Sequence, residues 1–155
     1  MNYPDYEDFL ESCNARSVRY LIVGGFAFSF HAIPRATKDL DLFIDPTPEN
    51  VDAALAAIRE FFGGDEMKIL AADLMEPGRF IQLGVSPHRI DLMNRLASRV
   101  DFGEAWERRC SARFGRVPAF YLDLDDLIRE KKSSGRPQDL VDLAGLQRAK
   151  QRKTP

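Results

Sequence analysis

The segment YLIVGGFAFSFHAIPRATKDLDLFID, from Tyr20 to Asp45, constrains the fold of this chain more than any other. A short apolar run ends in Gly24 and Gly25, a helix-like interval follows, and a strand-like run then carries two aspartates one residue apart. A strand that ends in glycines and turns into a helix leaves backbone N–H groups free to meet a phosphate. The sequence has neither G-x-G-x-x-G nor G-x-x-x-x-G-K-[ST], so a plain strand-to-helix turn explains the glycines equally well.

Asp39 and Asp41 stand at i and i+2 of the strand-like run, so their side chains share one face, with Cα atoms about 6.5–7 Å apart. Leu40, Leu42 and Ile44 would then face the core. Two ionised carboxylates this close raise each other's pKa unless a cation lies between them, and Mg²⁺ prefers such oxygen ligands. The alternative is an edge strand with a solvated polar face, which is the commoner reason for an isolated D-x-D.

A third carboxylate, Asp91, lies in the second of two strand-like runs, RFIQLGV and HRIDLM, which Ser86 and Pro87 join as a predicted hairpin. Asp91 points away from the face of Ile90 and Leu92, and alone it would be an ordinary exposed residue. Taken together, the glycine turn, the D-x-D strand and this aspartate could converge. Three carboxylates can hold two Mg²⁺ ions about 3.5–4 Å apart, the arrangement of two-metal phosphoryl and nucleotidyl transfer.

Apolar periodicity predicts the remaining elements. Helices are expected over residues 4–14, 26–33, 47–62, 98–110, 124–134 and 138–150, and strands or extended segments over 18–25, 40–45, 67–70, 79–85, 88–93 and 116–122. Helices alternate with strands but a hairpin is included, which predicts an α/β (α+β) fold with a mixed sheet flanked by helices. We expect one domain over residues 1–155, with a core at about 18–146 and a basic tail at 147–155.

Composition adds only broad limits. The 155 residues are 45% apolar and 30% charged, as in a soluble globular domain, and no apolar run approaches the ~20 residues of a membrane span. The acidic, amphipathic start is unlike a signal peptide, and Cys13 and Cys110 are too few for a disulfide framework, so we expect a cytoplasmic protein without membrane contact. The net charge of −2 gives no general attraction for nucleic acid, although the basic last third could face phosphates or an acidic partner.

Two motifs resemble a known family. Gly24-Gly25, thirteen intervening residues and DLDL resemble the G-[GS]-x(9–13)-D-x-D signature of the DNA polymerase beta-like nucleotidyltransferase superfamily. The chain is most similar to small bacterial nucleotidyltransferases, some of which are parts of toxin–antitoxin or abortive-infection systems. LDDLIREKKSSGRPQDLVDLAGL also resembles their C-terminal stretch, with an L-I-x-x-K helix followed by R-P-x-D-L-x-D-L. The likeness spans roughly residues 18–146 and implies a nucleotidyltransferase fold.

This resemblance implies roles for individual residues. Asp39, Asp41 and Asp91 would be the catalytic carboxylates and would ligate Mg²⁺, with two ions expected. Gly24 and Gly25 would let backbone amides hold the β- and γ-phosphates of an NTP.

Three basic residues are further candidates for nucleotide binding. Arg35 and Lys38 precede the D-x-D strand and could neutralise triphosphate oxygens, while Lys131 occupies the basic position of the L-I-x-x-K helix. The alternative for each is an exposed charge, which is as common an explanation for Lys131 and the commoner one for Arg35 and Lys38.

The implied activity is Mg²⁺-dependent transfer of a nucleoside monophosphate from an NTP to a hydroxyl, with release of pyrophosphate. The acceptor could be a small molecule, an RNA end or a protein side chain. The alternative is a non-catalytic nucleotide-binding protein or a toxin–antitoxin component that acts through a partner protein. A D-x-D glycosyltransferase is disfavoured, because only 38 residues precede Asp39.

Overall fold

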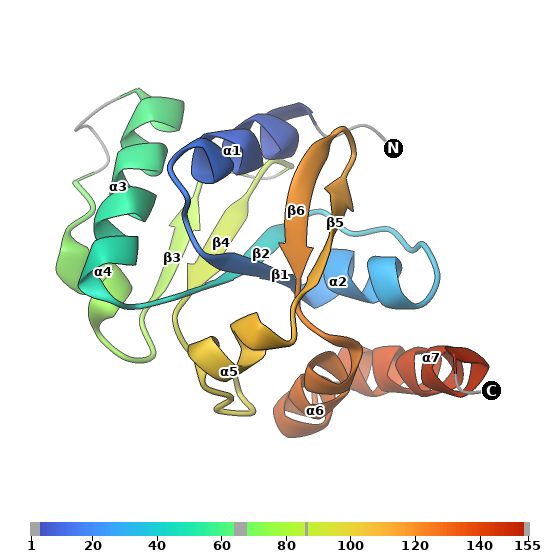
Figure 1. The fold of residues 1–155 in the computed structure, drawn as a ribbon. Coiled ribbons are helices and arrows are strands. Elements are labelled where there is room, and N and C mark those ends of the chain that lie inside the picture. The colour runs from blue at the N-terminus through green and yellow to red at the C-terminus, as the bar shows by residue number, and fades with distance from the viewer. Residues whose placement is uncertain (1–3, 64–67, 86, 154–155) are drawn as a thin grey trace.

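The apolar segments of the chain build a six-stranded sheet with helices on both faces (Figure 1). The computed structural model describes residues 4–63, 68–85 and 87–153. Within these ranges the helices are α1 (Pro4–Ala15), α2 (Gly24–His31), α3 (Pro48–Phe62), α4 (Ala71–Met75), α5 (Phe102–Glu107), α6 (Leu124–Ser134) and α7 (Pro137–Lys153). The strands are β1 (Tyr20–Val23), β2 (Leu40–Ile44), β3 (Phe80–Leu83), β4 (Ile90–Met93), β5 (Cys110–Phe114) and β6 (Val117–Tyr121).

The strands follow the order β3-β4-β2-β1-β6-β5. β1 pairs antiparallel with β2 and parallel with β6, and β2 pairs parallel with β4. An antiparallel hairpin forms each edge, β3 with β4 and β5 with β6. The mixed sheet and the β3–β4 hairpin confirm the expected class and that predicted pairing, while Ser86 of the predicted turn lies outside the described residues.

The two faces of the sheet have different coverings. On one face Leu42 packs with Phe9 of α1 and Ile58 of α3, and the apolar residues of β2 that were predicted to face the core are buried there. On the other face Phe43 contacts Phe102 of α5, with ring centroids 5.0 Å apart. Figure 1 shows α1 and α3 on one side of the sheet, and α5, α6 and α7 on the other. Asp41, two residues before Phe43, therefore lies on the face opposite α1 and α3.

Helix caps follow the sequence signals. The side chain of Asp123 accepts hydrogen bonds from the backbone N–H groups of Asp125 and Asp126 at the start of α6. Gly135 ends that helix in the left-handed conformation, with φ at +61°, and Gly63 ends α3 in the same way. An aspartate N-cap and left-handed glycine C-caps are the residues commonly found at these helix ends.

The strand predicted over residues 67–70 is wrong for the described residues 68–70, which lie outside the sheet and lead into α4. Asp73 explains the difference, because its Oδ2 accepts a hydrogen bond from the backbone N–H of Leu70 at 2.9 Å. Such a local side-chain bond stabilises the first turn of a helix and competes with strand pairing. Met67 lies outside the described residues.

The helix predicted over residues 98–110 is too long. Asp101 caps α5 by accepting from the N–H of Glu104 at 3.1 Å, and the helix stops at Glu107. Cys110 then begins β5, which the sequence did not predict, and Gly115 turns the chain into β6 with φ at +59°. Cross-strand pairing with β6 overrides the local helical pattern here. At the C-terminal end, residues 147–153 continue α7 rather than forming a separate tail.

Neither Cys13 nor Cys110 forms a disulfide. A search of the described ranges finds no helix with both the length and the apolarity that a membrane span requires.

Candidate active site

The first element of the site is the junction between β1 and α2. Gly24 begins α2 with φ at +67°, a conformation that side chains of L-residues rarely adopt. A Cβ at this position would lie 2.2 Å from Oδ2 of Asp41, which faces the end of β1 across the sheet. The glycine is therefore required twice, for the turn and for the close approach of the aspartate.

The parallel pairing of β2 and β4 places Asp41 directly beside Asp91. Paired residues on neighbouring strands point to the same face, and Asp39 joins them from the residue before β2. All three line one pocket of about 440 Å³, in which Asp91 is only 4% exposed. The structure thus brings together the three carboxylates that the sequence singled out.

Arg89 joins two of these carboxylates. Its Nη2 donates to Oδ2 of Asp39 at 2.8 Å and to Oδ2 of Asp91 at 3.2 Å. Its Nε lies 3.1 Å from Oδ1 of Asp91, but neither of these two buried atoms has an aligned hydrogen bond. Arg89 was not among the predicted site residues, although its position two residues before Asp91 was a usable signal for a shared face.

The negative charges of Asp41 and Asp91 are not fully compensated by nearby positive charge. The pKa of Asp41 is raised to about 7, first by burial and then by the negative charges of Asp91 and Asp39. Burial also raises the pKa of Asp91, against the opposing charge of Arg89. The pKa of Asp41 therefore lies close to neutral pH, well above the usual range of an aspartate.

The oxygen donors suit a divalent cation, although they do not form a complete metal cage. Among the residues that the structure describes, no group of three or more His, Cys, Asp or Glu side chains is arranged to hold a metal ion. Oδ1 of Asp91 is nevertheless a buried oxygen without a hydrogen bond, and Asp41 has a raised pKa. Both observations fit an oxygen-preferring cation such as Mg²⁺, provided that Arg89 moves aside.

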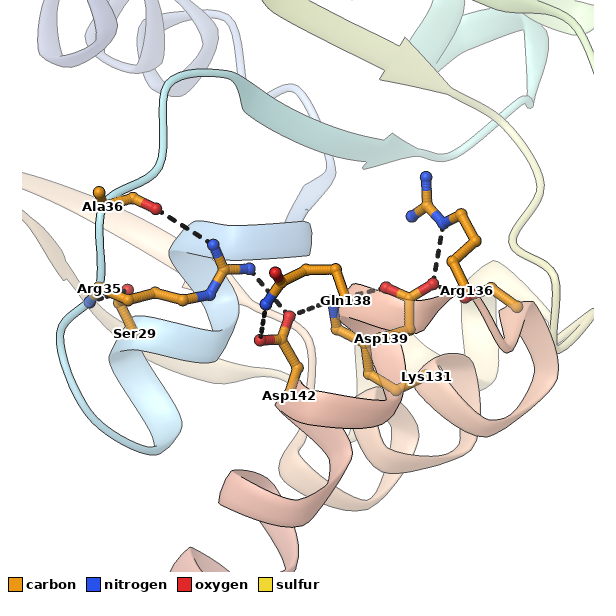
Figure 2. A network of polar contacts seen from close by, with 9 residues as sticks. Ser29, Arg35, Ala36, Lys131, Arg136, Gln138, Asp139 and Asp142 are labelled. Atoms are coloured by element: carbon orange, nitrogen blue, oxygen red, sulfur yellow. Dashed lines mark hydrogen bonds and ion pairs between the residues drawn. The ribbon is translucent and has the colours of Figure 1, made fainter.

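Lys131 of α6 is buried against two carboxylates of α7 (Figure 2). Its Nζ lies 3.3 Å from Oδ1 of Asp139 and 3.0 Å from Oδ2 of Asp142. Arg136 Nε donates to Oδ2 of Asp139, and Arg35 Nη2 donates to Oδ2 of Asp142, each at 2.8 Å. This network ties the loop before β2 to α6 and α7, and it holds Lys131 at the pocket wall.

The carboxylates of this network are held in their ionised form. Burial alone would raise the pKa of Asp139, but hydrogen bonds from Arg136 and Ser134 and the charge of Lys131 lower it to about 2. The pKa of Asp142 is lowered in the same way against burial, chiefly by the hydrogen bond from Lys131. In this network basic side chains balance the carboxylates and lower their pKa, whereas the pKa values of Asp41 and Asp91 are raised.

Most of the predicted site residues line the pocket, namely Gly24, Asp39, Asp41, Asp91 and Lys131. Gly25 does not line the pocket, and a Cβ added there would meet Oγ1 of Thr37 at 2.4 Å. The side chains of Arg35 and Lys38 are not brought to the pocket wall: Arg35 holds Asp142, and Lys38 is exposed.

The pocket also contains basic side chains that were not predicted from the sequence. Besides Arg89 these are Arg79, Arg95 and Arg136. Arg136 is the arginine of the R-P-x-D-L motif, so its place beside Lys131 could have been inferred from that motif. Arg79 and Arg95 flank the β3–β4 hairpin and carry no motif of their own.

This fold is shared with a protein of known structure. The crystal structure of a protein from Thermotoga maritima, described as a candidate nucleotidyltransferase, matches with a TM-score of 0.56. The two chains are 15% identical, and the match covers 93% of each. An identity this low shows the shared fold alone. No curated protein matches the chain.

The fold is therefore that of a nucleotidyltransferase, with the glycine turn and the acidic strand pair in one pocket. The chain belongs to the family described as "Nucleotidyltransferase of unknown function (DUF6036)", which matches residues 7–150. Neither comparison bears on membership of a toxin–antitoxin system, which stays a prediction.

Proposed function

We propose that the protein transfers a nucleoside monophosphate from an NTP to a hydroxyl group and releases pyrophosphate, in a reaction that depends on Mg²⁺. The observation that carries this proposal is the in-register pair of Asp41 and Asp91 beside Gly24 in one pocket. Membership of a nucleotidyltransferase family supports the same reaction class.

The triphosphate would bind on the side of the pocket formed by α2 and α6. Gly24 starts α2, whose first backbone N–H groups attract phosphate oxygens. Lys131 and Arg136 supply positive charge to the same side, and both pair with Asp139. Binding of the NTP would exchange part of these carboxylate contacts for phosphate contacts.

The carboxylates act on the opposite side of the reacting phosphate. Asp39, Asp41 and Asp91 would hold Mg²⁺, two ions in all, whose charge would neutralise the triphosphate and activate the acceptor hydroxyl. The acceptor oxygen attacks the α-phosphorus, the bond between the α-phosphorus and the α,β-bridging oxygen breaks, and pyrophosphate leaves. Asp91 is suited to accept the hydroxyl proton, because burial raises its pKa.

Labelling tests this proposal. The wild-type protein is incubated with α-labelled NTPs, Mg²⁺ and cell extract, beside Asp39→Asn, Asp41→Asn and Asp91→Asn. Asp52→Asn on the exposed face of α3 is the matched control. We expect label transfer by the wild type and the control only. Transfer that persists in Asp39→Asn and Asp41→Asn shows that the assigned carboxylates are wrong.

A second candidate function is nucleotide binding without catalysis. Arg89 favours it, because its guanidinium already supplies a cation to Asp39 and Asp91, and no metal-ready group of side chains exists in the described residues. Calorimetry that detects NTP binding, with no label transfer and a protein that co-purifies with the chain, would favour this role. A partner protein and a cytoplasmic location remain proposals under either function.

A further inference from the structure

The pocket has a second wall, formed by the β3–β4 hairpin beyond Asp91. Phe80 of β3 pairs with Met93 of β4, and Gln82 pairs with Asp91. Met93 stands two residues after Asp91 on β4, so the two side chains point to the same face of the sheet. Phe80 points to that face as well, because it is paired with Met93. Both line the pocket, and Phe80 is 52% exposed although it is large and apolar. The hairpin therefore presents an uncovered aromatic ring beside the buried carboxylate.

Arg95 completes this wall. It follows β4, lines the pocket and lies against Gly78, where a Cβ would meet its Nη2 at 2.4 Å. Within the part of the chain that the structure describes, Arg95 has no hydrogen bond or ion pair, whereas Arg79 pairs with both Asp73 and Glu76. An exposed guanidinium that lacks a carboxylate is available to an anion.

The loop that carries Gly78 is fixed in place by Asn94. The side-chain oxygen of Asn94 accepts from the N–H of Gly78 at 3.0 Å, and its amide nitrogen donates to the carbonyl oxygens of Leu74 and Glu76, each at 2.8 Å. Asn94 is itself buried. The turn beside Phe80 and Arg95 is thus held by three hydrogen bonds from one buried side chain.

The strand order separates this wall from the nucleotide side. Gly24 and Lys131 lie on the α2 and α6 side, while Phe80 and Arg95 lie at the β3 edge, with Asp41 and the rest of the carboxylates between them. A ligand on the hairpin wall would therefore approach the carboxylates from the side opposite the triphosphate.

We infer that the hairpin wall of Phe80, Met93 and Arg95 binds the acceptor, and that the acceptor is a nucleotide whose base stacks on Phe80. Its phosphate pairs with Arg95, and its free hydroxyl points to Asp91. This assignment rests on the proposed function. An aromatic face beside an unpaired arginine is the chemistry that recognises a base with its phosphate, and a protein hydroxyl would leave Arg95 unused. The nucleotide can be free or the last unit of an RNA.

Fluorescence of 2-aminopurine, which falls when the base stacks, tests this inference. The probes are 2-aminopurine riboside, its 5′-monophosphate and a short RNA that ends in 2-aminopurine with a free 3′-hydroxyl. Phe80→Leu should weaken binding of the two phosphate-bearing probes about tenfold, because the stacking face is lost while an apolar side chain remains. Phe80→Tyr should bind as the wild type does. Val85→Ser, at an exposed apolar residue outside the pocket, is the matched control.

Arg95→Gln separates the phosphate contact from stacking. It should weaken binding of the monophosphate and the RNA several-fold and leave the unphosphorylated riboside unchanged, with Arg152→Gln on α7 as control. Binding of the monophosphate alone identifies a free nucleotide as acceptor, and binding of the RNA alone identifies an RNA end. Wild-type affinity in both Phe80→Leu and Arg95→Gln, or no quenching of any probe, overturns the inference.

The labelling experiment keeps the two proposals apart. Label transfer that requires Asp41 but is equally fast in Phe80→Leu leaves the proposed function standing and removes the nucleotide acceptor. A labelled protein side chain as the product does the same. If transfer does not require Asp41, the proposed function fails, whatever the probes show.

Discussion

Arg89 lies against Asp91, with 3.1 Å between Nε and Oδ1 and 3.2 Å between Nη2 and Oδ2. The same guanidinium also holds Asp39 at 2.8 Å. A fixed positive charge therefore occupies the place where two carboxylates would share a metal ion. The arginine offsets part of the negative charge of the pocket, and it competes with any cation that enters.

Removal of this charge should strengthen cation binding. Arg89→Met frees both carboxylates from an ion pair and removes a repelling charge, so the affinity for Mn²⁺ should rise about tenfold. Calorimetry with Mn²⁺ alone measures this without any reaction. Arg79→Met is the matched control, because Arg79 lines the same pocket but pairs with Asp73 and Glu76. Unchanged or weaker Mn²⁺ binding in Arg89→Met would contradict the competition.

Asp41→Asn should stabilise the metal-free protein. The folded-state pKa of Asp41 is about 7, above its ordinary 3.8, so stability is lost as pH rises between these values. The amide cannot ionise, and the free energy of unfolding at pH 8 should rise by about 2 kcal/mol, since partial contact with water reduces the full effect. Denaturant unfolding with a chelator present measures it, with Asp52→Asn as control. The gain should shrink as pH falls towards 4, and a constant gain would exclude this cause.

Gly24→Ala should distort the site as well as destabilise the fold. The left-handed backbone of Gly24 costs an alanine about 1–2 kcal/mol, and the new Cβ would also collide with Asp41. Gly63→Ala is the matched control, because Gly63 has φ at +87° and a Cβ added there would meet no atom within 4 Å. Thermal unfolding should show the larger loss for Gly24→Ala. Equal losses in the two variants would mean that the contact with Asp41 is unimportant.

The network around Lys131 should set the stability of the protein in acid. The folded-state pKa of Asp139 is about 2, below its ordinary 3.8, so its contribution is complete above pH 4 and is lost as pH falls towards 2. The loss is about 2 kcal/mol for the wild type over this interval. Asp139→Asn should be less stable at pH 6 and should show a flatter pH profile, whereas Asp125→Asn at an exposed position should follow the wild type. Parallel profiles for Asp139→Asn and the wild type would refute this assignment.

Local patterns in the sequence predicted the elements that form the core of the fold. The apolar stripe of α1, the glycine end of β1 and the caps at Asp123 and Gly135 all depend on residues close in sequence, so they could be inferred directly. The β5 strand could not, because Cys110 follows a helical pattern and becomes a strand only through pairing with β6. The short helix after Leu70 depends likewise on one side-chain bond from Asp73.

In the candidate site too, features set by residues close in sequence could be predicted, and features set by strand pairing could not. The two-residue spacing of Asp39 and Asp41 predicts that they share a face, but the pairing of Asp41 with Asp91 depends on the β2–β4 register, which the sequence does not specify. The burial of Lys131 could not be predicted for a similar reason. A lysine in a helical pattern predicts an exposed side chain, and only the packing of α6 on α7 buries Lys131 against Asp139.

The shared contacts of Asp142 with Arg35 and Lys131 have a consequence for synthesis. Strands β2 and β4 leave the ribosome well before α7, since domains are made from the N-terminus onward. Until α7 has been made, Arg35 and Lys131 therefore lack the carboxylate that holds both of them in the finished fold.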